Sequence, residues 1–132
     1  MATHSKSSVA ICSLIRAKAC YLEGDWISST ILAGAAQRIL KDLCVAAGIE
    51  PTIDTVSASL GRKPYEVHNL ITTSYNGMKH ADRDPEGTVD VSSKEPQALI
   101  VMAAADLVRL KIPYSSTVGE ILNFAKSFSV EQ

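Results

Sequence analysis

Apolar residues recur at three- and four-residue intervals along most of the chain, which is the pattern of helices that bury one face. Glycines follow three of the resulting segments, at positions 24, 48 and 61, as they commonly follow helices. Six segments share the pattern, and they cover about residues 8–23, 25–47, 52–60, 64–80, 92–110 and 117–128. The pattern therefore predicts an all-α protein.

Polar residues with helix-capping chemistry stand before several of these segments. Asp25 precedes the longest one as a candidate N-cap. Ser92 with Glu95, and Thr117 with Glu120, have the spacing of a capping box, in which each side chain accepts from the other residue's backbone N–H. We expect these residues to fix where the helices begin.

The one long loop covers residues 82–94, where Asp84-Pro85 and Glu86-Gly87 are turn signals. Residues 88–91 could pair briefly as a strand, but a single strand makes no sheet. The run 98–105 has the composition of a buried strand, yet its continuation to Leu110 favours a helix. We expect a single domain over residues 1–132, an antiparallel bundle of about five main helices.

The periodic positions also predict the core. Small residues dominate 32–36, which permits a neighbouring backbone to approach closely. The large side chains that we expect to be buried are Leu32, Ile39, Leu43, Leu70, Ile71, Ile100, Leu107, Ile121 and Leu122.

Composition narrows the class of protein. Hydrophobic residues make up 46% and charged residues 20% of the 132, which is typical of a globular chain, and the formal net charge of -1 lacks the basic excess of a general nucleic-acid binder. The sequence has no run of about 20 apolar residues, so we expect a cytoplasmic protein. Cys12, Cys20 and Cys44 have no C-x-x-C spacing and are expected to be buried free thiols.

The most unusual stretch is residues 75–85, YNGMKHADRDP, at a predicted helix end and the start of the long loop. A polar stripe leads to it along the helix: Tyr65, Asn69, Thr73, Asn76 and His80. Such a stripe is usually a solvated face. The candidate catalytic residues, should there be a catalytic site, are Asn76, Lys79, His80 and Arg83.

Asp82 and Asp84 are candidate ligand-binding residues in the same stretch. Their spacing does not fit an EF-hand loop, and a salt-bridge cluster with Arg83 is the favoured interpretation. Metal-assisted hydrolysis at His80, Asp82 and Asp84 ranks lowest, because only one histidine is near. We expect no metal and no cofactor, since the sequence contains no P-loop, G-x-G-x-x-G, H-E-x-x-H or G-x-S-x-G motif.

Two stretches carry a resemblance. Residues 32–51, LAGAAQRILKDLCVAAGIEP, and residues 76–85, NGMKHADRDP, resemble uncharacterised small bacterial helical proteins that have a motif close to N-x-x-KHADRDP. The resemblance covers about residues 25–112 and implies no established activity.

More loosely, the layout is similar to HEPN domains, which are helical bundles found in many toxin ribonucleases and nucleotide-binding modules. Their catalytic motif has an Arg, usually a polar residue, three further residues and a His near a helix end. Asn76 and His80 fit this motif, but Tyr75 stands in the place of the Arg, which removes a phosphate-stabilising cation. Lys79 or Arg83 would have to replace it. Arg62 and His68 match the spacing only at a helix start.

Two functions follow as hypotheses. The first is a non-enzymatic helical interaction module, homodimeric, because no catalytic set is complete and two helices are rich in small and apolar residues. The alternative is a divergent HEPN-like ribonuclease or nucleotide-binding protein that uses the Asn76–His80 helix end. Only the alternative gives the protein a nucleic-acid partner, and neither involves a membrane.

Overall fold

The protein is an all-α helical bundle. The computed structural model describes residues 1–130, with side chains through residue 128, and contains no strand in that part. Its helices are α1 (Lys6–Leu22), α2 (Trp26–Ala46), α3 (Thr52–Ser59), α4 (Pro64–Lys79), α5 (Lys94–Arg109) and α6 (Ser116–Val130). The predicted all-α class is confirmed, with six helices in place of about five, and residues 88–91 form no strand.

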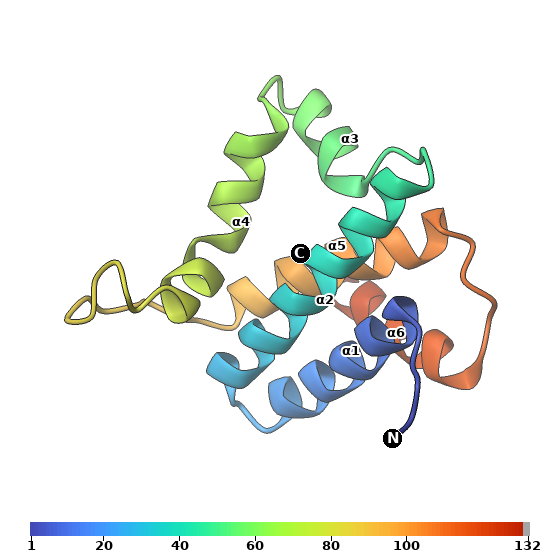
Figure 1. Ribbon diagram of the computed structural model, residues 1–132, viewed down its shortest axis with the longest axis horizontal. Coiled ribbons are helices and arrows are strands. Elements are labelled where there is room, and N and C mark those ends of the chain that lie inside the picture. The colour runs from blue at the N-terminus through green and yellow to red at the C-terminus, as the bar shows by residue number, and fades with distance from the viewer. Residues whose placement is uncertain (131–132) are drawn as a thin grey trace.

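Helix α2 occupies the centre of the bundle, packed against α1 on one side and α5 on the other (Figure 1). Alanines line these contacts on all three helices, so the backbones approach closely. The hydroxyl of Ser29 on α2 donates a hydrogen bond to the carbonyl of Ala17 on α1 at 2.8 Å. Helix α6 closes the bundle against α1 and α5, whereas α3 and α4 form an angled pair beside it.

The buried core centres on the three helices α1, α2 and α5. Three predicted core residues are buried in this core: Ile100 and Leu107 on α5, and Ile121 on α6. Five others are half-buried and pack against the core: Leu32, Ile39, Leu43, Ile71 and Leu122. The prediction for Leu70 is wrong, because α4 turns Val67 and Ile71 toward the protein and leaves Leu70 67% exposed.

The helix starts follow the sequence signals in two of three cases. Asp25 accepts from the Ser28 N–H at 3.0 Å and caps α2 as predicted. Glu95 accepts from the Ser92 N–H at 2.8 Å, which is one half of the predicted capping box, although α5 begins only at Lys94.

The predicted cap of α6 is wrong. Ser115, not Thr117, accepts a hydrogen bond from the Val118 N–H, at 3.1 Å. Helix α6 begins at Ser116, so Thr117 lies inside the helix and cannot be its N-cap. One oxygen of the Glu120 carboxylate pairs instead with Lys18 of α1 at 2.6 Å.

A buried carboxylate joins α3 to the bundle. Asp106 of α5 is 1% exposed, and its Oδ1 accepts from the Thr52 N–H at 2.8 Å, at the positive end of α3. Arg109, one turn further along α5, donates to the Glu50 carbonyl at 2.8 Å. A small apolar cluster of Ile53, Val67 and Met102 then connects α3 and α4 to α5.

The three cysteines are free, and Cys44 is buried as predicted, whereas the predicted burial is wrong for Cys12. Cys12 is exposed on the outer side of α1, Cys20 is half-buried and Cys44 is buried. Burial and the neighbouring Asp106 raise the pKa of the Cys44 thiol to about 11. No helix within residues 1–130 combines the length and apolar character that a membrane crossing requires.

Replacing Asp106 by Ala should destabilise the protein by about 2 kcal/mol, because the Thr52 N–H loses its acceptor in a buried position. Asp106→Asn keeps an oxygen acceptor and should cost less. Urea unfolding of both variants measures the difference. An Asp106→Ala variant as stable as the parent protein would contradict the capping role.

Thiol labelling should separate the cysteines. Near pH 8 we expect Cys12 to react first with a thiol reagent, because it is exposed. Cys44 should stay unlabelled until the protein unfolds, because it is buried and its raised pKa keeps it a neutral thiol. Mass spectrometry of the labelled peptides gives the order, and labelling of Cys44 as fast as Cys12 in the native protein would refute its burial.

Candidate functional site

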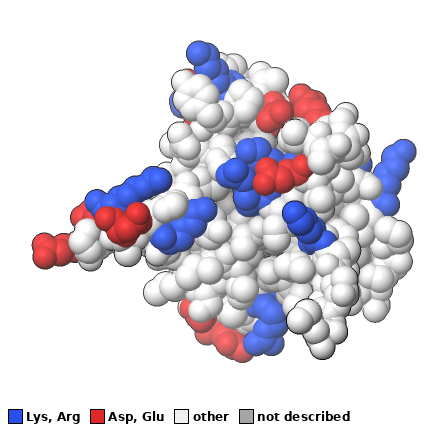
Figure 2. Space-filling model, in the orientation of Figure 1, with Lys and Arg blue, Asp and Glu red and all other residues white. Residues whose placement is uncertain are grey.

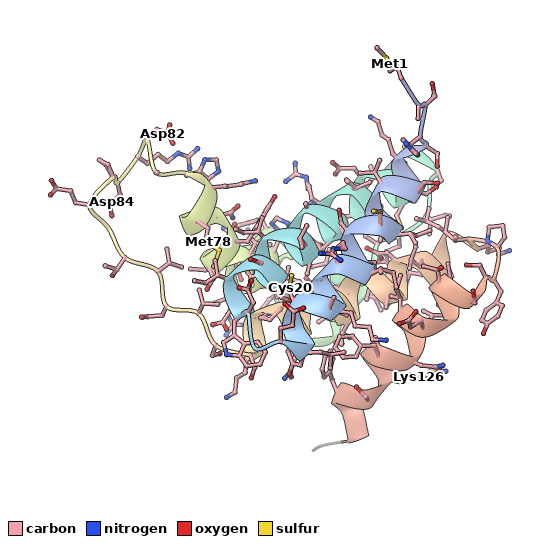
Figure 3. All side chains as sticks on the ribbon, turned by 90° about the horizontal axis from the view of Figure 1, so that it is seen from below. Met1, Cys20, Met78, Asp82, Asp84 and Lys126 are labelled. Carbon is pink, nitrogen blue, oxygen red and sulfur yellow. The ribbon has the colours of Figure 1, made fainter. Side chains whose placement is uncertain are left out.

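The residues singled out by the sequence lie where α4 ends and the long loop begins. The loop projects away from the helices, and Asp82 and Asp84 lie on its outer part (Figure 3). His80 ends the helix with a φ of -114° and a ψ of 50°, and its backbone N–H still donates to the Asn76 carbonyl. The chain then turns, with the Arg83 N–H donating to the His80 carbonyl at 3.1 Å.

The returning half of the loop is fastened to α4 at two points. Val89 packs on Gly77, where an added Cβ would fall 3.1 Å from a Val89 methyl carbon. The hydroxyl of Ser74, one turn earlier, donates to the carbonyl of Asp90 at 2.9 Å. Gly77 therefore provides the space, and Ser74 the hydrogen bond, that hold the loop against the helix.

Between the helix end and the loop lies a pocket of about 270 Å³. It is lined by Asn76, Gly77, His80, Arg83, Asp84, Gly87, Thr88 and Val89. The structure thus brings together four of the six candidate residues, namely Asn76, His80, Arg83 and Asp84. Asp82 and Lys79 do not line it.

Lys79 lies on another side of α4. Its Nζ is 4.6 Å from the centre of the Tyr75 ring, within reach of a cation–π interaction. That ring in turn fills the space beside Gly34 of α2, where a Cβ would fall 2.5 Å from the ring. Tyr75, which replaces the Arg of the HEPN motif, therefore joins α4 to α2 and does not line the pocket.

The side chain of Asn76 is held along its own helix. Its Nδ2 donates to the Thr72 Oγ1 at 3.0 Å, and that hydroxyl donates to the His68 carbonyl at 2.7 Å. These bonds fix the amide at the pocket wall. A His and an Arg beside a fixed amide suit the binding of a polar ligand, and the hydroxyl side chain in the lining is that of Thr88.

The expected salt bridges of the loop are not formed. Among the described side chains, the ion pairs are Lys18–Glu120 and Arg38–Asp42, so the prediction that Arg83 pairs with Asp82 or Asp84 is wrong. Arg83 and Asp84 line the same pocket without pairing, and the Asp84 carboxylate lies against Gly87. Within residues 1–130 no three His, Cys, Asp or Glu side chains are grouped as metal ligands would be.

A second cluster escaped the sequence analysis. His68 of α4 is half-buried, and burial together with the charges of Lys41, Arg38 and Lys79 lowers its pKa, while Asp42 opposes the shift. The sequence shows that residues 38 and 41 belong to one predicted helix and residues 68 and 79 to another. It does not show that these two helices pack against each other, because that depends on the tertiary structure.

No protein-family model, curated protein or solved structure matches the chain. The resemblance of residues 32–51 and 76–85 to small bacterial helical proteins stays a prediction. The candidate site is therefore interpreted from its geometry.

Replacing Ser74 by Ala should loosen the loop, because the Asp90 carbonyl loses its donor from α4. We expect a cost of about 1 kcal/mol in local opening and faster proteolysis within residues 81–90. Asp82→Ala is the control, since Asp82 forms no salt bridge among the described side chains. Equal digestion rates for the two variants would show that the Ser74 bond does not hold the loop.

Proposed function

We propose that the protein is a non-enzymatic helical interaction module that forms a homodimer through α5 and α6. The observation that supports the proposal is an apolar hollow of about 460 Å³ between these helices. It is lined by Val101, Ala104, Ala105, Val108, Leu122, Ala125 and Lys126. All of these residues except Lys126 are apolar.

The same face carries apolar side chains that project from it. Val101 is 40% and Val108 60% exposed, although both line the hollow. A two-fold dimer requires one surface that offers both a hollow and the side chains to fill it, since each residue meets the same surface on the other copy. A face with this combination suits a second copy of the chain.

An adjoining hollow extends the surface. It measures about 360 Å³ and lies where α3, α4, α5 and α6 approach one another, with Val56, Ile71, Met102 and Phe128 in its lining. Val101 belongs to both hollows, so the apolar surface continues along α5. Apolar patches of this continuity are typical of protein–protein contacts.

The alternative, a divergent HEPN-like ribonuclease or nucleotide-binding protein, is supported by the shared pocket of Asn76, His80 and Arg83. Against cleavage, the position of the motif Arg is held by Tyr75, whose ring packs beside Gly34. Incubation with mixed RNA separates the two functions. Cleavage that disappears in His80→Ala would favour the nuclease over our proposal.

We assign the module to the cytoplasm. The three free thiols support this assignment, because they suit a reducing compartment.

Size-exclusion chromatography with light scattering should show a dimer at micromolar concentration. Val108→Glu places a charge in the apolar contact and should raise the dimer dissociation constant roughly tenfold or more. Val45→Glu makes the same change at a valine that is also exposed, at 61%, but lies on α2, and should leave the dimer intact. A parent protein that is strictly monomeric at high micromolar concentration would overturn the proposal.

A further inference from the structure

The hollow of about 360 Å³ between α3, α4, α5 and α6 combines an apolar lining with one charge. On the face where α1 and α2 lie, by contrast, charged side chains of both signs form separate groups (Figure 2). Among the described residues that line the hollow, the charged one is Lys94, and the others are apolar except for Gln97. We call this hollow the α5 groove.

One side of α5 forms the floor of the α5 groove and gives it a direction. Lys94 begins this floor and Val101 lies two turns later, about 10 Å along the helix at a rise of about 1.5 Å per residue. Gln97 and Ala98 lie between them on the same side of the helix, because residues three, four and seven apart share a face. The groove therefore has a cationic end and an apolar end.

No acid among the described residues lies in the groove with Lys94. Lys94 is exposed, and in the described part of the chain it forms no ion pair. The adjacent Glu95 lines a different hollow, beside α4 and the long loop, and its carboxylate accepts from the N–H and the hydroxyl of Ser92. Lys94 is also the first residue of α5, where the positive end of the helix dipole adds to the attraction for an anion.

The walls of the groove are held in place by Tyr21 of α1. The Nε2 of Gln97 donates to the Tyr21 hydroxyl at 2.6 Å. The Phe128 ring of α6, which also lines the groove, has its centre 5.2 Å from that of the Tyr21 ring. Two lining side chains are thus positioned by contacts within the protein, and sites for small molecules are usually preformed in this way.

We propose that the α5 groove binds a medium-chain carboxylate, which has an apolar chain and one anionic end. The carboxylate pairs with Lys94, and the chain lies over Ala98 toward Val101. A neutral chain would leave the lysine without a partner, whereas a small anion would leave the apolar floor uncovered. At about 30 Å³ for each non-hydrogen atom, the volume holds about 12 of them, which corresponds to a chain of about eight to ten carbons.

This inference goes beyond the proposed dimer and does not rest on it. The α5 groove shares Val101 with the hollow between α5 and α6, but Val108 does not line the groove. The Val108→Glu variant, which should separate the dimer, is therefore expected to bind the carboxylate as the parent does. A strictly monomeric protein that binds octanoate would refute the dimer and support the groove.

Methyl resonances of carbon-13-labelled methionine test the groove directly, because Met102 lines it whereas Met1 and Met78 do not. Octanoate should shift the Met102 resonance saturably at millimolar concentration or below and leave the other two unchanged. From hexanoate to octanoate, each added methylene should tighten binding about fourfold, as expected for the burial of one methylene. The gain per methylene should end once the chain exceeds the length of the groove.

A charge-removing variant tests the cationic end. Lys94→Gln should weaken octanoate binding about fivefold and leave the binding of octanol, which has the same chain without the charge, unchanged. Lys6→Gln is the matched control, because Lys6 is also exposed and begins a helix but does not line the groove. The proposal fails if octanoate produces no saturable shift of Met102 at millimolar concentration, or if Lys94→Gln binds octanoate as tightly as Lys6→Gln does.

Discussion

The contact between the Tyr75 ring and Gly34 sets the position of α4, and both candidate sites depend on it. Any side chain at residue 34 would overlap the ring, so the helices meet at this distance only because α2 has a glycine there. With the ring in this position, Lys79 lies over it, and the charges of Arg38 and Lys41 help to lower the pKa of His68. The opposite side of α4 is then left free to receive the loop at Gly77.

A polar anchor complements this contact at the other end of the angled helix pair. Asp106 holds the first turn of α3 by a buried hydrogen bond, and only a small apolar cluster around Ile53 and Val67 reinforces it. The α1–α2–α5 core is packed with apolar side chains, whereas the α3–α4 pair relies on a few specific contacts, so the two parts differ in how readily they open.

The features of the fold that depend on residues close together in the sequence were predicted correctly. The helical periods, the three glycine stops and the Asp25 cap depend on neighbouring residues, and all of them are present in the structure. Leu70 was predicted to be buried because it repeats at helical spacing with other apolar residues of α4. It is exposed because the packing of α4 on the bundle determines which side of the helix is buried. The Thr117 signal failed because Ser115, two residues earlier, caps α6.

In the candidate site too, the sequence indicates what depends on nearby residues but not what depends on the packing of two helices. Of the stretch 75–85, Asn76, His80, Arg83 and Asp84 share one pocket. The sequence could not show that Lys79 leaves this group for Tyr75, or that His68 joins the cations of α2, because both depend on how two helices meet. Arg83 and Asp84 line one pocket but form no ion pair among the described side chains, which their adjacency in the sequence could not show.

The way the loop is attached to α4 also determines where the chain can accept inserted residues. Its return path is fixed at Val89 and Asp90, while residues 81–87 are exposed and contact the bundle little. Lengthening a surface loop costs only slowly increasing closure entropy. Added residues near Asp82 would therefore extend outward without disturbing either end, which makes this tip a natural place for an inserted epitope or for divergence among related chains.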